Sequence, residues 1–264
     1  MRTLLGGTVG LLGTRVPVPG GPSWQRTSFS GSAVSLSGGV SAASGILAAS
    51  LCTKSSVRSA ALIAGASGAI AGYIDDHRES TTAKGLKGHI GMLKQGRVTT
   101  GALKIGIIGG GSALAALIVS ASDQNSSRAG QVWDWGIRST AIAGTANLIN
   151  LLDLRPGRAL KASGLIAALL VPGSKEATPL LAGTAGTIAG TIGEDLAGKT
   201  MLGDLGANAL GAVLGTALAA HPSRAVRNAG AAGAAGLILA SEKVSFSAVI
   251  EASPVLSAID GWGR

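Results

Sequence analysis

The chain consists of apolar segments rich in glycine and alanine that follow one another with only short polar connections. Of its 264 residues 46% are hydrophobic and 13% are charged, whereas a water-soluble domain has about a quarter of its residues charged. Lipid is therefore the better solvent for this chain. The 42 glycines follow no three-residue period, which excludes collagen, and the apolar fraction excludes disorder. We expect an all-α fold, a polytopic integral membrane helix bundle whose small residues let the helices pack closely.

Basic residues outnumber acidic ones and give a formal net charge of +9. They are spread between the apolar segments, and only 3% of the residues are aromatic, so no basic face with aromatic rings for base stacking is expected. We therefore expect no nucleic-acid partner and attribute the charge to membrane topology. The single cysteine, Cys52, excludes an internal disulfide and does not indicate the redox compartment.

About eight or nine transmembrane helices are expected, since a span needs about 20 mainly apolar residues and fewer where neighbouring helices cover its ends. The eight clearest candidates are residues 33–51, 57–74, 101–121, 137–152, 162–171, 178–192, 206–220 and 229–240. Residues 1–16 are either a signal-like segment or a first span, and we favour a span because prolines follow as an extended linker. Residues 1–264 then form a single polytopic membrane domain, with a basic cytoplasmic loop at about 75–100 and a C-terminal tail at about 241–264.

Alternation of these spans places four connections and the C-terminal tail on one side of the membrane. The connections are residues 15–32, 75–100, 153–161 and 195–205. This side carries fourteen lysines and arginines and the other side eight, so the positive-inside rule places it in the cytoplasm. We expect a multi-pass protein of the cell membrane. Within the tail, residues 250–259 have the pattern of a short interfacial helix with Trp262 at its end.

Two neighbouring carboxylates, Asp75 and Asp76, end an apolar segment on this side. They repel each other and are costly to desolvate unless a cation or a lysine lies between them; the alternative is a solvated helix end. Asp204 opens a later span on the same side. Mg²⁺ takes a few carboxylates together with water and substrate phosphates, so we expect all three aspartates to converge on one such ion. No set of histidines and cysteines has the spacing of a zinc site.

Asn147 and Asn150 lie one helical turn apart on an apolar segment that ends at Asp153. Their amides are either interhelical hydrogen-bonding groups or substrate ligands, and the spacing alone does not decide between the two. Lys84 belongs to a basic cluster in the loop that follows the aspartate pair. Such a cluster rests on anionic lipid, binds a pyrophosphate, or does both.

Residues 193–200, Gly-Glu-Asp-Leu-Ala-Gly-Lys-Thr, match the Walker A pattern of a nucleotide-binding loop. That loop requires a preceding buried strand in a soluble α/β sheet, whereas Gly/Ala-rich membrane segments flank this one. We therefore expect no P-loop here.

Four sequence blocks occur in the order found in one family of membrane enzymes. They are residues 26–39, 72–76 (Gly-Tyr-Ile-Asp-Asp), 147–153 (Asn-Leu-Ile-Asn-Leu-Leu-Asp) and 201–206 (Met-Leu-Gly-Asp-Leu-Gly). With these blocks the chain resembles the polyprenyl-phosphate N-acetylhexosamine-1-phosphate transferases. That family includes phospho-MurNAc-pentapeptide translocase and UDP-GlcNAc:undecaprenyl-phosphate GlcNAc-1-phosphate transferase.

The resemblance implies Mg²⁺-dependent transfer of a sugar-1-phosphate from a UDP-N-acetylhexosamine to polyprenyl phosphate at the cytoplasmic face, with release of UMP, in bacterial envelope glycan biosynthesis. It implies that Asp75 deprotonates the lipid phosphate or attacks the donor, that Asp76 is its catalytic neighbour, and that Asp204 binds Mg²⁺. The residues implied to bind substrate are Lys84, Asn147, Asn150 and Asp153. The expected partners are the UDP-sugar, polyprenyl phosphate, membrane lipid and a second copy of the chain in a homodimer.

The chain also departs from the family pattern. Pro156 stands where the family has a second aspartate after the asparagine pair, Ala207 replaces a serine, and the His-rich late loop is reduced to His221. The variant Asp-Leu-Arg-Pro-Gly-Arg at residues 153–158 resembles a short branch from high-GC Gram-positive bacteria. These departures keep a second hypothesis open, a catalytically degenerate member that acts as a membrane binding or scaffold protein in envelope assembly. A transporter is disfavoured because the polar residues cluster at one face and not at mid-bilayer.

Overall fold

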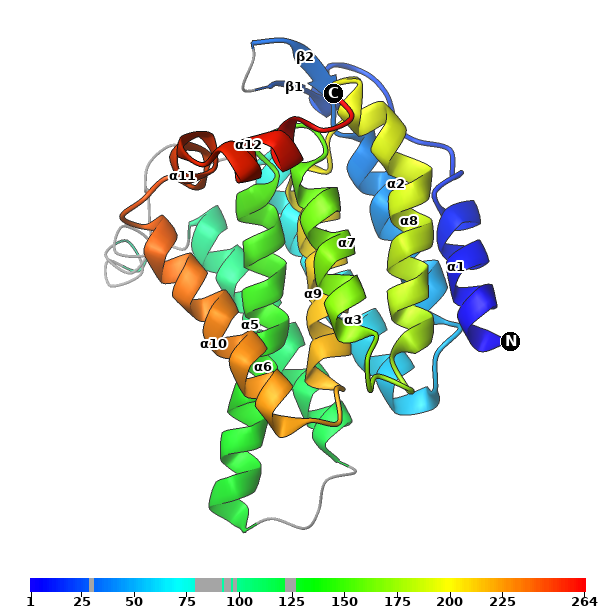
Figure 1. The fold of residues 1–264 in the computed structure, drawn as a ribbon, viewed down its shortest axis with the longest axis vertical. Coiled ribbons are helices and arrows are strands. Elements are labelled where there is room, and N and C mark those ends of the chain that lie inside the picture. The colour runs from blue at the N-terminus through cyan, green and yellow to red at the C-terminus, as the bar shows by residue number, and fades with distance from the viewer. Residues whose placement is uncertain (29–30, 79–91, 93–95, 97–98, 122–126) are drawn as a thin grey trace.

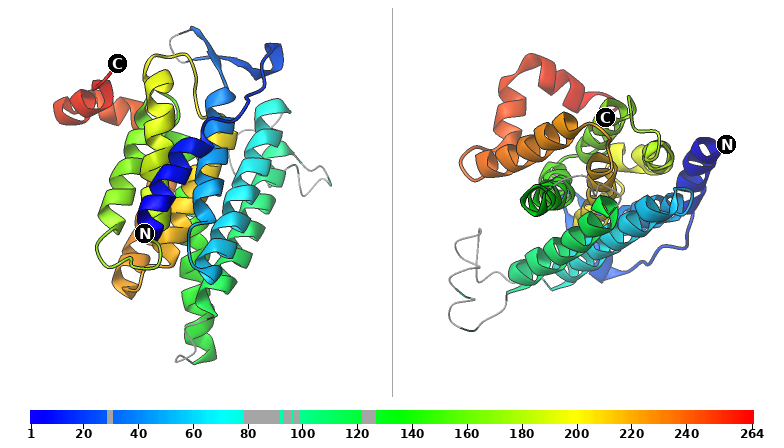
Figure 2. Two further views of the ribbon diagram at one scale, coloured as in Figure 1. Left: turned by 90° about the vertical axis from the view of Figure 1, so that its right-hand side faces the viewer. Right: turned by 90° about the horizontal axis from the view of Figure 1, so that it is seen from below.

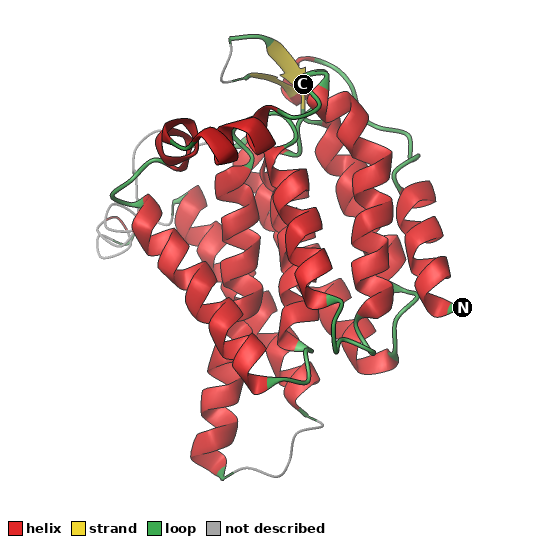
Figure 3. Cartoon of the chain, viewed as in Figure 1, coloured by secondary structure: helices red, strands yellow, loops and turns green. Residues whose placement is uncertain are grey.

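A computed structural model of the chain describes residues 1–28, 31–78, 92, 96, 99–121 and 127–264. Apart from an antiparallel ribbon of β1 (Gln25–Thr27) and β2 (Ala33–Ser35), the regular structure of these residues is helical, which confirms the all-α class (Figure 3). The helices are α1 (Arg2–Gly13), η1 (Pro22–Trp24), α2 (Ser37–Ser50), α3 (Ser55–His77), α5 (Thr100–Ser120), α6 (Arg128–Leu152), α7 (Arg158–Leu170), α8 (Thr178–Leu196), α9 (Gly203–Ala219), α10 (Arg224–Ser241), α11 (Phe246–Ala252) and α12 (Pro254–Gly261).

The helices from α1 to α10 run alternately up and down in the view of Figure 1. One end of the bundle is where α3, α6 and α8 finish and where α2, α5, α7 and α9 begin. We call it the carboxylate end, because it holds Asp75, Asp153, Asp195 and Asp204. The opposite end, where α1, α3, α6, α8 and α10 begin, is the distal end. The described parts of the connections that the sequence places on the cytoplasmic side lie together at the carboxylate end.

Among the described residues, two helices are long and apolar enough to cross a membrane, residues Ser56–His77 of α3 and the whole of α5. A third span results if α10 and α11, which meet at a bend of 96°, are taken together. Helix length therefore does not establish eight or nine spans, because α2, α7 and α9 have only 14, 13 and 17 residues. The outer surface does support membrane association, since Leu117, Leu169 and Leu239 on three different helices are 53% to 69% exposed.

Several predicted boundaries are wrong: α7 and α10 begin at Arg158 and Arg224, before residues 162 and 229, and two further cases have a clear cause. Residues 33–35, expected to begin a span, form β2, and helix α2 begins only at Ser37. The span expected from residue 137 lies in a helix that begins at Arg128, nine residues earlier. In that extension Asp134 accepts hydrogen bonds from Arg138 of the same helix and from Arg227 of α10. A hydropathy pattern counts each of these charges in full, whereas pairing offsets part of the cost of burying them.

Helix α9 forms the centre of the bundle, with nearly all of its residues buried, and packs against α2, α3 and α6. Glycines set the distance to two of these neighbours. A Cβ on Gly72 of α3 would lie 2.2 Å from the Asp204 carbonyl oxygen, and one on Gly39 of α2 would lie 2.1 Å from the Leu202 carbonyl oxygen. Backbones approach this closely only where one residue has no side chain. The glycine-rich composition therefore brings α2 and α3 against the start of α9.

Residues 193–200 lack the strand that a P-loop requires. Gly193 to Leu196 form the last turn of α8, and the residues before them are helical. Beyond the helix, the Lys199 carbonyl oxygen accepts a hydrogen bond from the Ser35 N–H at 3.0 Å, and the Met201 N–H donates to the Ser35 carbonyl oxygen at 2.9 Å. The segment therefore fixes the ribbon to the carboxylate end.

The C-terminal tail lies against the carboxylate end (Figure 2). Instead of one helix over residues 250–259 it contains α11 and α12, because the chain turns at Ser253 and Pro254 starts a new helix. Asp260 of α12 accepts hydrogen bonds from Arg158 Nε and Nη2 at 2.8 and 3.0 Å. Lys161 donates to the carbonyl oxygens of the last turn of α12. The segment at residues 153–158 thus supplies an arginine that docks the tail.

Candidate functional site

Three charged side chains from three helices meet at the carboxylate end. Asp75 lies near the end of α3, Lys104 in the first turns of α5 and Asp204 in the first turn of α9. The Lys104 Nζ atom lies 3.2 Å from Asp75 Oδ2 and also contacts Asp204 Oδ2. The three side chains are between 14% and 27% exposed. The two aspartates therefore share a cation that the chain itself provides.

Asn150 of α6 joins this group. In the amide orientation that satisfies its neighbours, Asn150 Nδ2 donates to Asp204 Oδ1 at 2.9 Å and Asn150 Oδ1 accepts from Lys104 Nζ at 3.1 Å. We call Asp75, Lys104, Asn150 and Asp204 the lysine–aspartate cluster. Asn147, one turn earlier on α6, is half-buried and its side chain makes no hydrogen bond to another described residue.

Lys104 is the residue of this cluster that the sequence did not single out. In the sequence it counts only as one of the basic residues on the cytoplasmic side. One signal was present, because Lys104 lies inside an apolar segment long enough to cross a membrane. An ionisable residue in such a segment usually has a partner and a function. The sequence pattern does not identify the partner of Lys104, whereas the structure shows two, Asp75 and Asp204.

Asp76 does not join the shared lysine. Its carboxylate accepts hydrogen bonds from the backbone N–H groups of Asp204 at 3.2 Å and Leu205 at 3.0 Å. Helix α9 has no side-chain cap from its own N-cap residue, and a carboxylate is well suited to bind the free amides at a helix start. This differs from the expected convergence of all three aspartates on one cation, because the α9 amides bind Asp76 instead. Asp76 is thus a positioning residue for Asp204.

Replacement of Asp76 by alanine is expected to lower the unfolding temperature of the detergent-solubilised protein by about 3–6 °C, since loss of a helix cap costs about 1–2 kcal/mol. Asp76→Asn retains an acceptor oxygen, so its unfolding temperature should fall much less. Tryptophan fluorescence during heating measures both variants. Equal unfolding temperatures for Asp76→Ala and the wild type would show that this contact does not hold α9.

Asp153 follows α6 at the same end and is buried, with 8% of its surface exposed. Its Oδ2 atom has no hydrogen-bond partner among the described residues. Burial raises the pKa of the Asp153 carboxyl well above its usual range, and the nearby Asp195 raises it further, followed by Asp204 and Asp76. A buried acceptor without a partner next to other carboxylates is typical of a group that meets a ligand.

Asp153→Asn is expected to stabilise the folded chain by about 1–2 kcal/mol, or roughly 2–6 °C, because the amide carries no charge to desolvate. A carboxyl whose pKa is higher in the folded state destabilises that state as the pH rises through the folded-state pKa. The unfolding temperature of the wild type should therefore fall relative to that of the variant as the pH is raised. Thermal unfolding over a series of pH values measures this difference. A variant less stable than the wild type at every pH would mean that the carboxylate has a stabilising partner.

Two glycines with positive φ shape the backbone around these carboxylates. Gly203, with φ +57°, starts α9, and a Cβ there would lie 2.7 Å from Leu36 Cδ2 and 3.1 Å from Asp76 Oδ2. Gly157, with φ +74°, precedes α7, and its N–H donates to Asp195 Oδ1. Glycine adopts such a conformation without the steric cost of a side chain. These two turns allow Asp76 and Asp195 to bind backbone amides at helix starts.

Lys84 and the basic residues around it lie outside the described residues, so the expected role of this loop stays a prediction. The end of α3 that leads into the loop carries an aromatic group next to Asp76. Tyr73 and His77 stack with ring centroids 4.3 Å apart, and Trp24 packs edge-on against His77 at 4.8 Å. These contacts pack η1 against the end of α3.

The carboxylate oxygens of the cluster meet part of what a magnesium ion requires of its ligands. Asp75 and Asp204 each direct one oxygen to a single point, now held by Lys104 Nζ, and the unpartnered Asp153 Oδ2 is buried at the same end. Among the described residues, no group of three His, Cys, Asp or Glu side chains is arranged to hold a metal ion. Mg²⁺ commonly binds one or two carboxylates together with water and substrate phosphates. The described residues alone therefore do not form a metal site, and the oxygens of Asp75 and Asp204 at Lys104 are the donors that could contribute to one.

The carboxylate end thus combines a largely buried ammonium, two carboxylates bound to it, an amide and the buried Asp153, whose Oδ2 atom has no partner among the described residues. In such a set the ammonium and the amide can donate hydrogen bonds to phosphoryl oxygens, and the carboxylates can accept protons. No family model and no curated protein matches this chain.

Proposed function

We propose that the chain is a phosphoglycosyl transferase of the polyprenyl-phosphate N-acetylhexosamine-1-phosphate transferase family. It transfers a sugar-1-phosphate from a UDP-N-acetylhexosamine to polyprenyl phosphate and releases UMP. The observation that carries the proposal is the position of Lys104 between Asp75 and Asp204. A buried lysine with two carboxylates provides both a fixed positive charge for phosphate oxygens and a group that accepts a proton. The aspartates belong to the sequence blocks that resemble the family.

In the proposed reaction an oxygen of polyprenyl phosphate attacks the β-phosphorus of the UDP-sugar. A new P–O bond forms, the bond from the β-phosphorus to the bridging oxygen breaks, and UMP leaves with the electron pair. Asp75 takes the proton of the acceptor phosphate. Lys104 and Asn150 bind phosphoryl oxygens on which negative charge develops, and Asp153 orients the donor through its free oxygen.

Asp204 is the residue that would hold Mg²⁺ together with the pyrophosphate of the donor, whereas Asp75 acts as the base. The bound ion would supply charge neutralisation at the pyrophosphate and at the leaving UMP. Asp76 acts through the α9 backbone. It accepts hydrogen bonds from the N–H groups of Asp204 and Leu205 and so holds Asp204 in place. Its replacement by asparagine should therefore be tolerated better than replacement of Asp75 or Asp204.

We also propose that α1 to α10 form eight or nine membrane spans, with the carboxylate end in the cytoplasm. The alternating direction of the helices supports this arrangement, as does the larger number of basic residues on that side. The short helices α2, α7 and α9 fit because neighbouring helices cover them, which lowers the length that a span needs. A cytoplasmic site suits a water-soluble nucleotide donor and a membrane-bound acceptor.

One observation favours the alternative of a catalytically degenerate binding or scaffold protein. Arg158 and Lys161 follow the asparagine block, but both are bound by the tail and not directed into an open site. In such a protein the cluster would bind a lipid-linked or nucleotide sugar without turnover. Binding without UMP release separates this alternative from the transferase.

The test is UMP release by the purified protein in detergent, given polyprenyl phosphate, Mg²⁺ and a panel of UDP-N-acetylhexosamines. The proposal predicts release with at least one donor, dependent on both the lipid acceptor and the metal and abolished by EDTA. The sugar that supports release identifies the donor. Well-folded protein that binds a UDP-sugar but releases no UMP would refute the transferase and support the binding role.

A further inference from the structure

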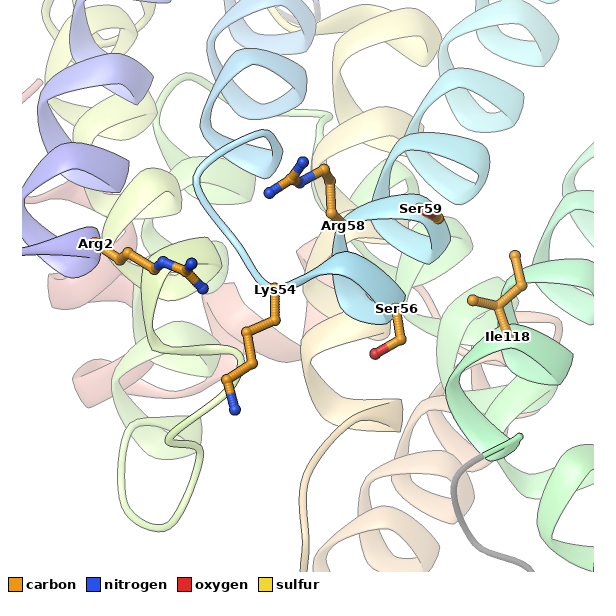
Figure 4. A pocket seen from close by; sticks show the side chains of 6 residues that line it. All are labelled: Arg2, Lys54, Ser56, Arg58, Ser59 and Ile118. Atoms are coloured by element: carbon orange, nitrogen blue, oxygen red, sulfur yellow. The ribbon is translucent and has the colours of Figure 1, made fainter.

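An open pocket of about 760 Å³ lies at the distal end of the bundle (Figure 4). We call it the distal basic pocket. It is lined by Arg2 of α1, by Lys54, Ser56, Arg58 and Ser59 at the start of α3, and by Ile118 of α5. Seventeen residues separate Arg58 from Asp75 along α3, which is about 25 Å of helix. The pocket is therefore a separate place from the lysine–aspartate cluster.

Three cations and no carboxylate line this pocket in the described part of the chain. The guanidinium groups of Arg2 and Arg58 point towards each other from two helices (Figure 4). Arg58 donates to the Thr53 carbonyl oxygen at 3.0 and 3.3 Å, which is a neutral acceptor. Lys54 pairs with Glu176 at 2.7 Å, and this pair is more than half exposed. Among the described residues, neither guanidinium group forms an ion pair with a carboxylate, so an anion would provide the counter-charge.

Membrane topology does not explain this gathering of cations. The predicted topology gives this side only eight of the 22 lysines and arginines, and basic residues are usually sparse on the side that does not face the cytoplasm. Six of these eight nevertheless line the distal basic pocket or an adjoining cavity of about 350 Å³, which shares Ser56 and contains Arg138, Lys175 and Arg227. Arg138 and Arg227 are both paired with Asp134, and Glu176 also lines the adjoining cavity, so the arginines of the two cavities without a carboxylate partner among the described residues are those of the distal basic pocket, Arg2 and Arg58. The cations of this end are thus collected at one place.

The surface beside the pocket is apolar. Ile118 borders the pocket, and Leu114 and Leu117, which lie on the same face of α5, are 50% and 53% exposed. A ligand with a phosphate and a hydrocarbon chain would satisfy both the cations and this face. We propose that Arg2, Lys54 and Arg58 bind the phosphate of an anionic membrane lipid, whose acyl chain lies along α5. This inference does not depend on the proposed transferase, because it concerns other residues at the other end of the bundle.

Native mass spectrometry of the full chain in detergent tests the proposal. The protein is incubated with equal amounts of phosphatidylglycerol and phosphatidylcholine, and the lipid retained is measured for each variant. The variants are Arg2→Gln, the triple Arg2→Gln/Lys54→Gln/Arg58→Gln, and the matched control Arg224→Gln, an exposed cation of the same end that lines neither cavity. Arg2 makes no side-chain hydrogen bond or ion pair with another described residue, so its single replacement leaves the fold undisturbed even if the triple variant is unstable.

We expect the wild type and Arg224→Gln to prefer phosphatidylglycerol, and the triple variant to bind it at least about tenfold more weakly, with an intermediate loss for Arg2→Gln. Equal retention by Arg2→Gln and Arg224→Gln would overturn the proposal. A parallel arm measures stabilisation of the wild type against heat by inorganic phosphate. Stabilisation by phosphate that Arg2→Gln abolishes, without a preference for phosphatidylglycerol, would identify a soluble phosphate as the ligand and overturn the lipid assignment.

Discussion

Asp204→Asn is expected to reduce the rate of UMP release by about a thousandfold or more, equivalent to about 4 kcal/mol of transition-state stabilisation. The asparagine has almost the same size as the aspartate, and Lys104 keeps Asp75 as its partner. The fold should therefore persist. What the variant loses is one of the two carboxylates that face the shared cation, and with it the ligand that would hold Mg²⁺ at the pyrophosphate.

The matched control for this variant is Glu251→Gln, which also removes a carboxylate at the carboxylate end. Glu251 lies in the tail, where it pairs with Arg155 of the connection between α6 and α7, and its side chain is 57% exposed. An exposed pair of this kind contributes about 0–1 kcal/mol to stability, so Glu251→Gln should retain nearly full activity. UMP release by both variants is compared at equal amounts of monodisperse protein. Similar rates for Asp204→Asn and the wild type would remove Asp204 from the site.

Lys104→Gln is expected to abolish activity and also to destabilise the chain. It leaves two largely buried carboxylates facing each other without their shared cation, and breaking a buried ion pair in this way costs about 3 kcal/mol or more. The unfolding temperature should fall by roughly 6–10 °C and UMP release by about a hundredfold or more. Thermal unfolding in detergent and the UMP assay measure the two effects separately.

The double variant Lys104→Gln/Asp75→Asn distinguishes the structural from the catalytic part of this effect. Removal of one carboxylate relieves the repulsion, so the double variant should regain most of the lost stability and none of the activity. A double variant as unstable as Lys104→Gln alone would contradict the charge argument. Recovery of activity would show that neither side chain takes part in the reaction.

Much of the architecture follows from the sequence alone. Apolar segments rich in glycine predict helices that pack closely in lipid. The contact of Gly72 with the backbone of Asp204 is an example. Alternation of the segments brings Asp75, Asn150 and Asp204 to one end because each lies at the boundary of a segment. The three residues do meet there, through Lys104.

The partners of these residues were less predictable, because they depend on three-dimensional contacts. Asp76 follows Asp75 directly in the sequence, yet it points at the amides of α9 and not at the shared lysine. The predicted span at residues 101–121 contains Lys104, but hydropathy alone does not show that two carboxylates from other helices compensate its charge. The longer start of α6 has the same cause, since Asp134 is paired with two arginines. In each case a long-range pair offsets a local penalty that a sequence pattern counts in full.

The docking of the tail also lies beyond sequence pattern. The sequence alone gives no reason for the arginines at residues 155 and 158. In the fold, Arg158 binds Asp260, which is 102 residues away along the chain. Contacts of such sequence separation leave no periodic signal.

The most direct test of the transferase follows the β-phosphate of the donor. A UDP-N-acetylhexosamine labelled with ³²P at the β-phosphate is incubated with the purified protein, polyprenyl phosphate and Mg²⁺, and the products are separated into lipid and water-soluble fractions. Phosphoglycosyl transfer predicts that the label moves into a lipid-linked product in the wild type and in Glu251→Gln, and not in Asp204→Asn. Label that stays in UDP, or that appears as a soluble sugar phosphate without lipid, would contradict phosphoglycosyl transfer.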